Sequence, residues 1–211
     1  MRASIALVAA LGAIVTAGAA NAASVDIRDA VARVTVIPED RNDVKVEFLT
    51  TNADLPLQVR TAGGETIIDG DLDRRISNCH RKENSYAAYV RGVGRVTYDN
   101  IPQVVIRTPR AVQVSANGVV FGTVGRSASL DLHNSGCSNW TIADVAGDAT
   151  IQDSGAGSVK MGQAGRLDLR LSGAGEIHVT RIRQSLEASL SGVGSVSIDD
   201  LAGSMEAKVS G

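Results

Sequence analysis

The stretches 154–157, 172–175 and 191–194 read Ser-Gly-Ala-Gly, Ser-Gly-Ala-Gly and Ser-Gly-Val-Gly. The pattern begins again at Ser210-Gly211, and a looser copy lies upstream at Ser135-Gly136. Successive copies begin 18 or 19 residues apart. A fixed period of this size is typical of solenoids, in which each repeat buries its apolar face by stacking on its neighbours. The repeat therefore predicts architecture more directly than chemistry.

Apolar residues fall into columns when the chain is laid out by this period. Within a coil they alternate with polar residues, as in 167–171 (Leu-Asp-Leu-Arg-Leu), and alternation at period two is typical of a half-buried strand. Upstream, Phe121 lies one period before Trp140. The predicted columns are Trp140, Val159, Ile177 and Val196; Ile142, Met161, Val179 and Ile198; Leu130, Ala149, Leu167, Leu186 and Met205; Leu132, Ile151, Leu169, Ala188 and Ala207.

Two strands and a glycine-rich corner in about 19 residues predict an all-β protein of the single-stranded parallel β-helix type. We expect the corner glycines to adopt positive φ and to leave room for the corner stacked on them. A second corner carries Gly147, Gly165 and Gly203, but the coil that starts at Ser172 has Ile182-Arg183-Gln184 there instead.

The chain divides into three parts: residues 1–22, 23–100 and 101–211. The first has a charged start, an apolar run and Ala20-Asn21-Ala22, the pattern of a cleaved secretory signal peptide. An uncleaved membrane anchor is the alternative, but the run is short and rich in small residues. We expect no transmembrane segment after cleavage, and an exported protein in the periplasm, on the outer surface or outside the cell.

Residues 23–100 form a β-rich N-terminal part that caps the regular coils of 101–211. Strand-like runs are separated by turn residues, and 91–99 reads as a degenerate copy of 191–199. We interpret the whole as one continuous stack with an irregular N-terminal cap, since terminal repeats must shield the core from water. The strand-like runs are 25–37, 44–49, 57–59 and 66–68.

The formal net charge is −2, and it becomes −3 once Arg2 is removed with the signal peptide. A nucleic-acid partner would require a clustered basic surface, so none is expected. The two cysteines, Cys79 and Cys137, are predicted to form a disulfide in an oxidising compartment. Two free buried thiols are the alternative.

Metal and cofactor sites are not expected. His80, His133 and His178 are scattered, and the residues after the second glycine of each repeat do not form the regular Asp ladder of calcium-binding solenoids. The predicted register does stack Asp168, Glu187 and Glu206 into an acidic ladder. Stacked carboxylates can bind a divalent cation or act as acid and base, but a solvated outer face is the favoured interpretation. We predict no catalytic residues.

The entry segment 101–110 (Ile-Pro-Gln-Val-Val-Ile-Arg-Thr-Pro-Arg) is followed by serial coils of the form Ser-Gly-x-Gly-Ser-Val-x-Ile-x-x-Leu-x-Gly-x-Leu. This combination resembles the bacterial domain of unknown function described as the auto-transporter adhesin head GIN domain. The likeness is clearest over 101–211 and weaker over 25–100. It implies a right-handed β-helix in an exported envelope protein and supplies no functional residues.

These observations predict a non-enzymatic, adhesin-like binding or structural module whose polar faces bind a polysaccharide or an envelope protein. Self-association through an open C-terminal coil, ending at Ser210-Gly211, is a further expectation. A polysaccharide lyase or hydrolase is the alternative, because parallel β-helices often carry such enzymes. It would need clustered carboxylates in a groove. A structural envelope component without a ligand is a third hypothesis.

Overall fold

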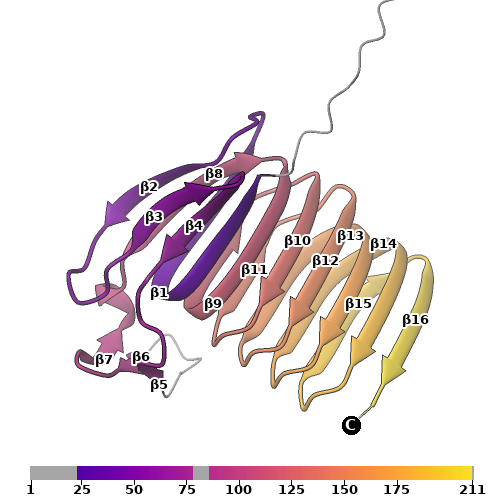
Figure 1. The fold of residues 1–211 in the computed structure, drawn as a ribbon. Coiled ribbons are helices and arrows are strands. Elements are labelled where there is room, and N and C mark those ends of the chain that lie inside the picture. Colours follow the sequence, from indigo (N-terminus) through magenta and orange to yellow (C-terminus); the bar gives the residue numbers. More distant parts are fainter. Residues whose placement is uncertain (1–22, 78–85, 211) are drawn as a thin grey trace, which may run out of the picture.

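A computed structural model describes residues 23–77 and 86–210. The fold is all-β with a parallel core, drawn as a long stack in Figure 1. One 13-stranded sheet forms the stack, and a 3-stranded antiparallel sheet lies at its N-terminal end. Within the described ranges, no helix has the length and apolar character that crossing a membrane requires.

The regular part of the stack is built from parallel strands in which each coil pairs with the one before it. Val159 pairs with Ile177, and Ile177 pairs with Val196. The four predicted apolar columns are confirmed by these registers. The strands are β9 (Ala111–Val124), β10 (Ser129–Asn134), β11 (Asn139–Ile142), β12 (Asp148–Asp153), β13 (Ser158–Leu171), β14 (Glu176–Leu190), β15 (Ser195–Leu201) and β16 (Ser204–Val209).

The core lies inside the coils because inward side chains alternate with outward ones along each strand. Leu167, Leu169 and Leu171 are buried, while Asp168 and Arg170 between them are not. Val159 and Ile177 are also buried. Val196 in β15 is only partly covered, and Met205 in β16 is 60% exposed, so the last coil is the least protected part of the apolar columns.

The corner glycines are required for close approach and not for positive φ. A Cβ on Gly173 would lie 1.9 Å from the carbonyl oxygen of Gly155, and one on Gly192 would lie 2.0 Å from that of Gly173. The glycines with positive φ are Gly63, Gly64, Gly92, Gly94 and Gly118. The prediction of positive φ at the repeated Ser-Gly corners is therefore wrong. Stacked backbone at the corner leaves no volume for a side chain.

The alignment of Phe121 with Trp140 is wrong by one residue. Trp140 pairs with Gly122, and a Cβ on Gly122 would lie 2.1 Å from the indole ring, so the glycine makes room for a large buried side chain. Phe121 belongs to a second apolar cluster and meets the Tyr98 ring edge-on at 5.1 Å. The sequence period does not show whether Trp140 stacks on position 121 or on position 122, because a shift of one residue leaves the spacing almost unchanged.

The N-terminal strand is intercalated into the stack, which corrects the interpretation of one continuous progression. The first half of β1 (Ser24–Glu39) pairs in parallel with β4 (Glu65–Asp69), and its second half pairs with β8 (Gln103–Pro109). Its opposite edge pairs along its length with β9. Chain order and axial order therefore differ: β1 separates β4 and β8 from β9 (Figure 1).

Two antiparallel strands cover the N-terminal edge of the stack. Strand β2 (Lys45–Thr50) pairs with β8, and β3 (Gln58–Ala62) pairs with β4. Each of these short strands has one partner, so β2 and β3 form the edge of the sheet at this end in place of a further parallel coil. That residues 23–100 act as a cap of the regular coils stays a prediction.

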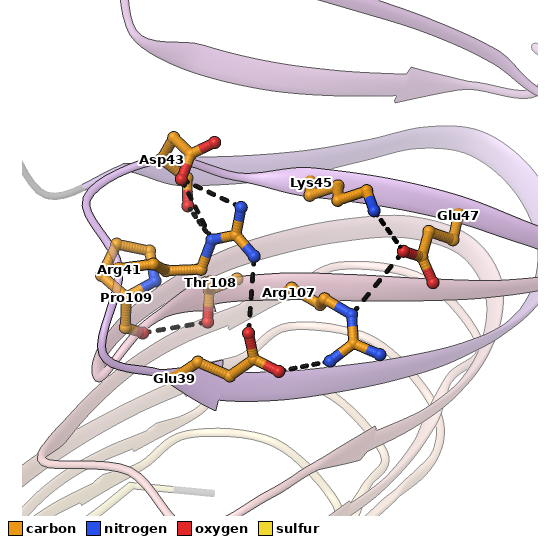
Figure 2. A network of polar contacts seen from close by, with 8 residues as sticks. All are labelled: Glu39, Arg41, Asp43, Lys45, Glu47, Arg107, Thr108 and Pro109. Carbon is orange, nitrogen blue, oxygen red and sulfur yellow. Dashed lines mark hydrogen bonds and ion pairs between the residues drawn. The ribbon is translucent and has the colours of Figure 1, made fainter.

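Ion pairs connect β2 and β8 to the end of β1 (Figure 2). Arg107 on β8 contacts both Glu39 on β1 and Glu47 on β2, and Arg41 bridges Glu39 to Asp43. Lys45 lies 2.7 Å from Glu47 and holds the pKa of that carboxyl below its usual value. Exposed pairs contribute little stability individually. Their arrangement does specify how the turn between β1 and β2 is placed.

Residues 91–99 do not form a coil of the stack. Strand β7 (Gly94–Thr97) pairs with β6 (Tyr86–Val90), which pairs with β5 (Ile76–Ser77), all antiparallel. A short 3-10 turn, η1 (Tyr98–Asn100), follows. The resemblance to 191–199 is therefore misleading, because alternating apolar residues after glycines serve a hairpin as well as a coil.

Candidate binding groove

An open groove of about 540 Å³ follows the Ser-Gly corner along the stack. It crosses several consecutive coils, from the coil of β1 to that of β14, and we call it the axial groove. Its lining is polar apart from Ala116 and Leu171. The lining residues are Asp26, Ser115, Ala116, Asn117, His133, Asn134, Ser135, Gln152, Asp153, Ser154, Arg170, Leu171, Ser172, Ser189 and Ser191.

One wall of the axial groove is a ladder of serine hydroxyls, Ser135, Ser154, Ser172 and Ser191, all exposed. Each backbone N–H donates to a carbonyl of the coil below, so the backbone fixes where the side chains stand. The hydroxyls of Ser135 and Ser154 reach those carbonyls only at 3.5 Å, a distance too long for a strong hydrogen bond. The ladder is therefore available to a ligand.

The other wall is a column of larger polar side chains. His133 pairs in register with Gln152, and Gln152 pairs with Arg170. Two of these side chains are oriented by acidic residues two positions earlier: His133 Nε2 lies 2.9 Å from Asp131 and Arg170 Nη2 lies 3.3 Å from Asp168. Parallel strands repeat at about 4.8 Å, so this wall presents hydrogen-bonding groups at a regular spacing.

A buried polar pair lies behind the Ser-Gly wall. Asn134 is 2% exposed and Asp153 is 1% exposed, although the equivalent position in the next coil is Leu171. Asn134 Nδ2 donates to Asp153 Oδ1 at 3.1 Å, and the backbone N–H of Gly155 donates to the same oxygen at 2.9 Å. This pair ties two neighbouring coils together at the floor of the groove.

The acidic ladder is assembled in one column: Asp168 pairs with Glu187, and Glu187 pairs with Glu206. A shallow open depression of about 410 Å³ contains all three. Arg170 lies 3.3 Å from Asp168, and Lys208 lies 3.0 Å from Glu206. The Glu206 carboxylate raises the pKa of Lys208, with a smaller contribution from Glu187. These ion pairs favour a solvated, charge-balanced face.

The histidines of the described part of the chain lie apart. His178 contacts Ser197 at 2.9 Å and Asp199 at 3.3 Å, whereas His133 lines the axial groove. Within residues 23–77 and 86–210, no group of three or more His, Cys, Asp or Glu side chains is arranged to hold a metal ion. His80 lies outside the described residues.

The predicted disulfide involves Cys79, which also lies outside the described residues. Cys137 packs beside the second apolar cluster, and no described cysteine is a free thiol. The Cys79–Cys137 pairing stays a prediction.

The last coil carries exposed apolar side chains at Val193, Met205 and Val209. Self-association through this coil likewise stays a prediction.

The axial groove was not predicted from the sequence, although its signal lies in the repeat itself. The period predicts stacked serines, but it does not show that the serines of the Ser-Gly pairs line one wall of a groove. Asn134 and Asp153 stand immediately before two of these serines, where Leu171 and Leu190 stand before later ones. A polar residue in an otherwise apolar column is the pattern that would have identified the groove floor.

No family model matches this chain, and no curated protein matches it. A crystal structure of a protein from Clostridium sporogenes, provisionally described as a cell adhesion protein, is similar over 89% of this chain and 93% of that one. The identity is 9% and the TM-score is 0.33. A likeness at this level carries no argument about function. The resemblance to the GIN domain family stays a prediction.

Proposed function

We propose that this protein is an exported, non-catalytic binding module that holds an extended polysaccharide along the axial groove. We also propose that its fold is a right-handed parallel β-helix, because crossovers between parallel strands are right-handed in nearly all proteins. The observation that carries the binding proposal is the polar groove that crosses consecutive coils, with a serine ladder on one side and His133, Gln152 and Arg170 on the other.

The geometry suits a chain-like ligand better than a compact one. Successive coils repeat the same polar groups at about 4.8 Å, so a ligand with many hydroxyl groups can meet several equivalent partners. A hydrogen bond to the coil below holds the backbone of each serine in place. Ligand binding therefore costs little backbone conformational entropy. An adhesin-like or wall-associated role follows naturally from such a surface.

The charge pattern supports binding over hydrolysis. Asp168 and Glu206 are each paired with a basic side chain two residues further on. A glycosidase needs one carboxyl group held protonated opposite a second that is ionised. The pairing of Asp168 and Glu206 with basic side chains supports a role of the ladder in surface charge balance.

Binding to a panel of immobilised neutral and acidic oligosaccharides tests the proposal. Arg170→Ala removes a groove donor, and Arg181→Ala is the matched control, since both arginines are exposed and paired with an aspartate. We expect Arg170→Ala to weaken binding of at least one glycan about tenfold and Arg181→Ala to leave it unchanged. Equal effects of the two variants, or no glycan bound by the wild type, would contradict the proposal.

Product release from the same panel tests the enzyme alternative. We expect none from the wild type. Cleavage that Asp168→Asn or Glu187→Gln abolishes would establish a hydrolase or lyase instead.

Export is tested by cell fractionation and by surface proteolysis of intact cells. A variant that lacks residues 1–22 is the control. An unchanged distribution of this variant between the cell fractions would argue against export through this segment.

A further inference from the structure

The second corner of the coils contains a pocket with an unusual concentration of arginine. It has a volume of about 310 Å³ and lies away from the axial groove, with which it shares no lining residue. Three guanidinium groups line it, from Arg110, Arg126 and Arg183, against one carboxylate, from Asp144. The remaining lining residues are Ser127, Ala128, Val145, Ala146 and Gln163.

Arg183 reaches this pocket because the repeat is broken at its position. Three coils have Ala-Gly at this corner, at 146–147, 164–165 and 202–203, but here the sequence is Ile182-Arg183-Gln184, and the register between β13 and β14 shifts just after Ala164. A bulge of this kind re-aims a side chain. The Arg183 guanidinium lies back over the preceding corners and donates to the carbonyl oxygens of Val145 and Ala146 at 3.3 and 2.5 Å.

Arg183 has no carboxylate partner among the residues that the structure describes. Its hydrogen-bond partners are carbonyl oxygens, which orient the guanidinium without neutralising it. Arg126 is exposed and has no hydrogen-bond or ion-pair partner within the part of the chain that the structure describes. Two cations thus stand at the pocket without carboxylate partners.

The third arginine is positioned by the N-terminal cap. Arg110 donates to Asp40, with Nη2 3.2 Å from Oδ2. Asp40 belongs to the turn between β1 and β2, beside the ion-pair network of Figure 2 that links Glu39 and Arg41. Among the described residues that line the pocket, the only carboxylate is that of Asp144, and its Oδ1 already accepts the backbone N–H of Gln163 at 3.1 Å. The electrostatic balance of the pocket is therefore positive.

A buried hydroxyl provides an independent sign of a ligand. Ser127 is only 5% exposed, lines the pocket, and its Oγ has no hydrogen-bond partner. Buried polar groups are normally satisfied, and an unpaired one is costly. A hydroxyl can donate to an anion, and guanidinium groups bind oxyanions with short, charge-assisted hydrogen bonds.

We propose that this pocket binds an oxyanion carried by an acidic glycan, with Arg126 and Arg183 as the charged donors, Ser127 as a neutral donor and Arg110 as a third cation. The glycan part of this inference rests on the proposed function; the anion site itself does not. A carboxylate, sulfate or phosphate group fits the same donors, because Arg recognises all three through paired N–H groups.

Calorimetric titrations at constant ionic strength test the site, using inorganic sulfate, inorganic phosphate and oligogalacturonate as separate probes. Arg126→Ala is the main variant, because its side chain has no hydrogen-bond or ion-pair partner in the described residues. Arg60→Ala, an exposed arginine on β3 outside the pocket, is the matched control for the loss of one positive charge. Ser127→Ala tests the buried donor.

We expect saturable binding of at least one probe to the wild type. Arg126→Ala should weaken it about tenfold, Ser127→Ala severalfold, and Arg60→Ala less than twofold. Arg183→Lys, which retains charge and loses the paired donors, should weaken it as well. An absence of saturable binding by all three probes, or equal losses in Arg126→Ala and Arg60→Ala, would overturn the site. Small-anion binding without oligogalacturonate binding would overturn its assignment to glycans.

The outcome separates this inference from the proposed function. Neutral glycan binding that is sensitive to Arg170→Ala reports on the axial groove, whereas anion binding that is sensitive to Arg126→Ala reports on the second corner. If the groove fails and the anion site survives, the role of the axial groove in glycan binding is wrong and the pocket stands. If the anion site fails alone, the groove stands.

Discussion

The two ends of the stack are held by pairings of very different sequence separation. In the C-terminal coils Val159 pairs with Ile177 one repeat later. At the N-terminal end Ser24 pairs with both Glu65 and Gln113, which are distant in the chain. Closing a long loop costs more conformational entropy than closing a short one, and non-local contacts slow folding. The difference indicates that C-terminal coils can add one after another, whereas the coil of β1 requires several segments together.

The largest expected effect comes from a charge placed in the intercalated strand. Val34 on β1 is buried between β8 and β9, so Val34→Asp buries an unpaired carboxylate where three segments meet. We expect a loss of about 5 kcal/mol or more and little folded protein. Val196→Asp in β15, at a partly covered position, should be tolerated far better. Circular dichroism and urea unfolding of both variants measure the contrast; equal stability would contradict it.

The next effect compares an interior coil with the last one. Leu169→Ala deletes a fully buried side chain from β13 and should cost about 2–5 kcal/mol in the free energy of unfolding. Met205→Ala removes a side chain that is 60% exposed and should cost about 1 kcal/mol or less. Urea unfolding monitored by circular dichroism gives both values. A similar cost for the two would mean that the last coil is as well packed as the interior.

Two glycines distinguish crowding in the coils from conformation in the cap. Gly173→Ala places a Cβ 1.9 Å from a backbone carbonyl of the coil below and should destabilise by about 1–3 kcal/mol. Gly64→Ala, in the turn between β3 and β4, meets nothing within 4 Å but has a φ of +89°, so its cost of about 1 kcal/mol is backbone strain alone. Thermal unfolding measures the loss of stability in each variant. A larger loss in Gly64→Ala than in Gly173→Ala would contradict the crowding argument.

The smallest effect is a pH-dependent one at the irregularity of β1. Burial raises the pKa of Asp29, and the carboxylates of Asp73 and Asp69 raise it further. A raised acid pKa means that the ionised form opposes folding, so stability falls as the pH rises through that range and recovers on acidification. Asp29→Asn should stabilise the protein at pH 7 by about 1 kcal/mol or less.

The same variant should show no difference from the wild type near pH 3, where the carboxyl group is protonated in both states. Asparagine tolerates the φ of 47° at this position, so backbone strain does not change. Urea unfolding at the two pH values supplies the measurement. A gain in stability of Asp29→Asn that persists at pH 3 would show that removal of the carboxylate charge is not its cause.

Much of the regular region could be predicted from the sequence because its contacts repeat at a local period. The columns that include Val159 and Leu167 follow directly from the 18- and 19-residue intervals, and so does the acidic ladder of Asp168, Glu187 and Glu206. The prediction of a coil at 91–99 is wrong: β7 belongs to an antiparallel hairpin, and alternation is common to both arrangements. Trp140 stacks on Gly122 and not on Phe121, because only a glycine leaves room for the indole ring. The spacing of the repeat does not contain this information.

The candidate sites were less accessible to sequence reasoning. The axial groove brings Ser135 and Ser191 onto one wall only once the corners are stacked. The arginine pocket joins Arg110, Arg126 and Arg183 from three different coils, and the sequence pattern marks only the irregular Ile182-Arg183-Gln184. Surface clusters depend on which side chains the corners direct toward one another.

The amino-acid sequence by itself determined the strand character, the period and the apolar columns, because these depend on local alternation and on a repeat that each coil carries within itself. Only the tertiary structure decided that β1 lies between β8 and β9 and that arginines converge at the second corner. The physical reason is that both depend on pairings between distant segments. Which distant segments pair depends on how the whole chain buries its apolar side chains and covers its sheet edges. No short stretch of sequence contains that information.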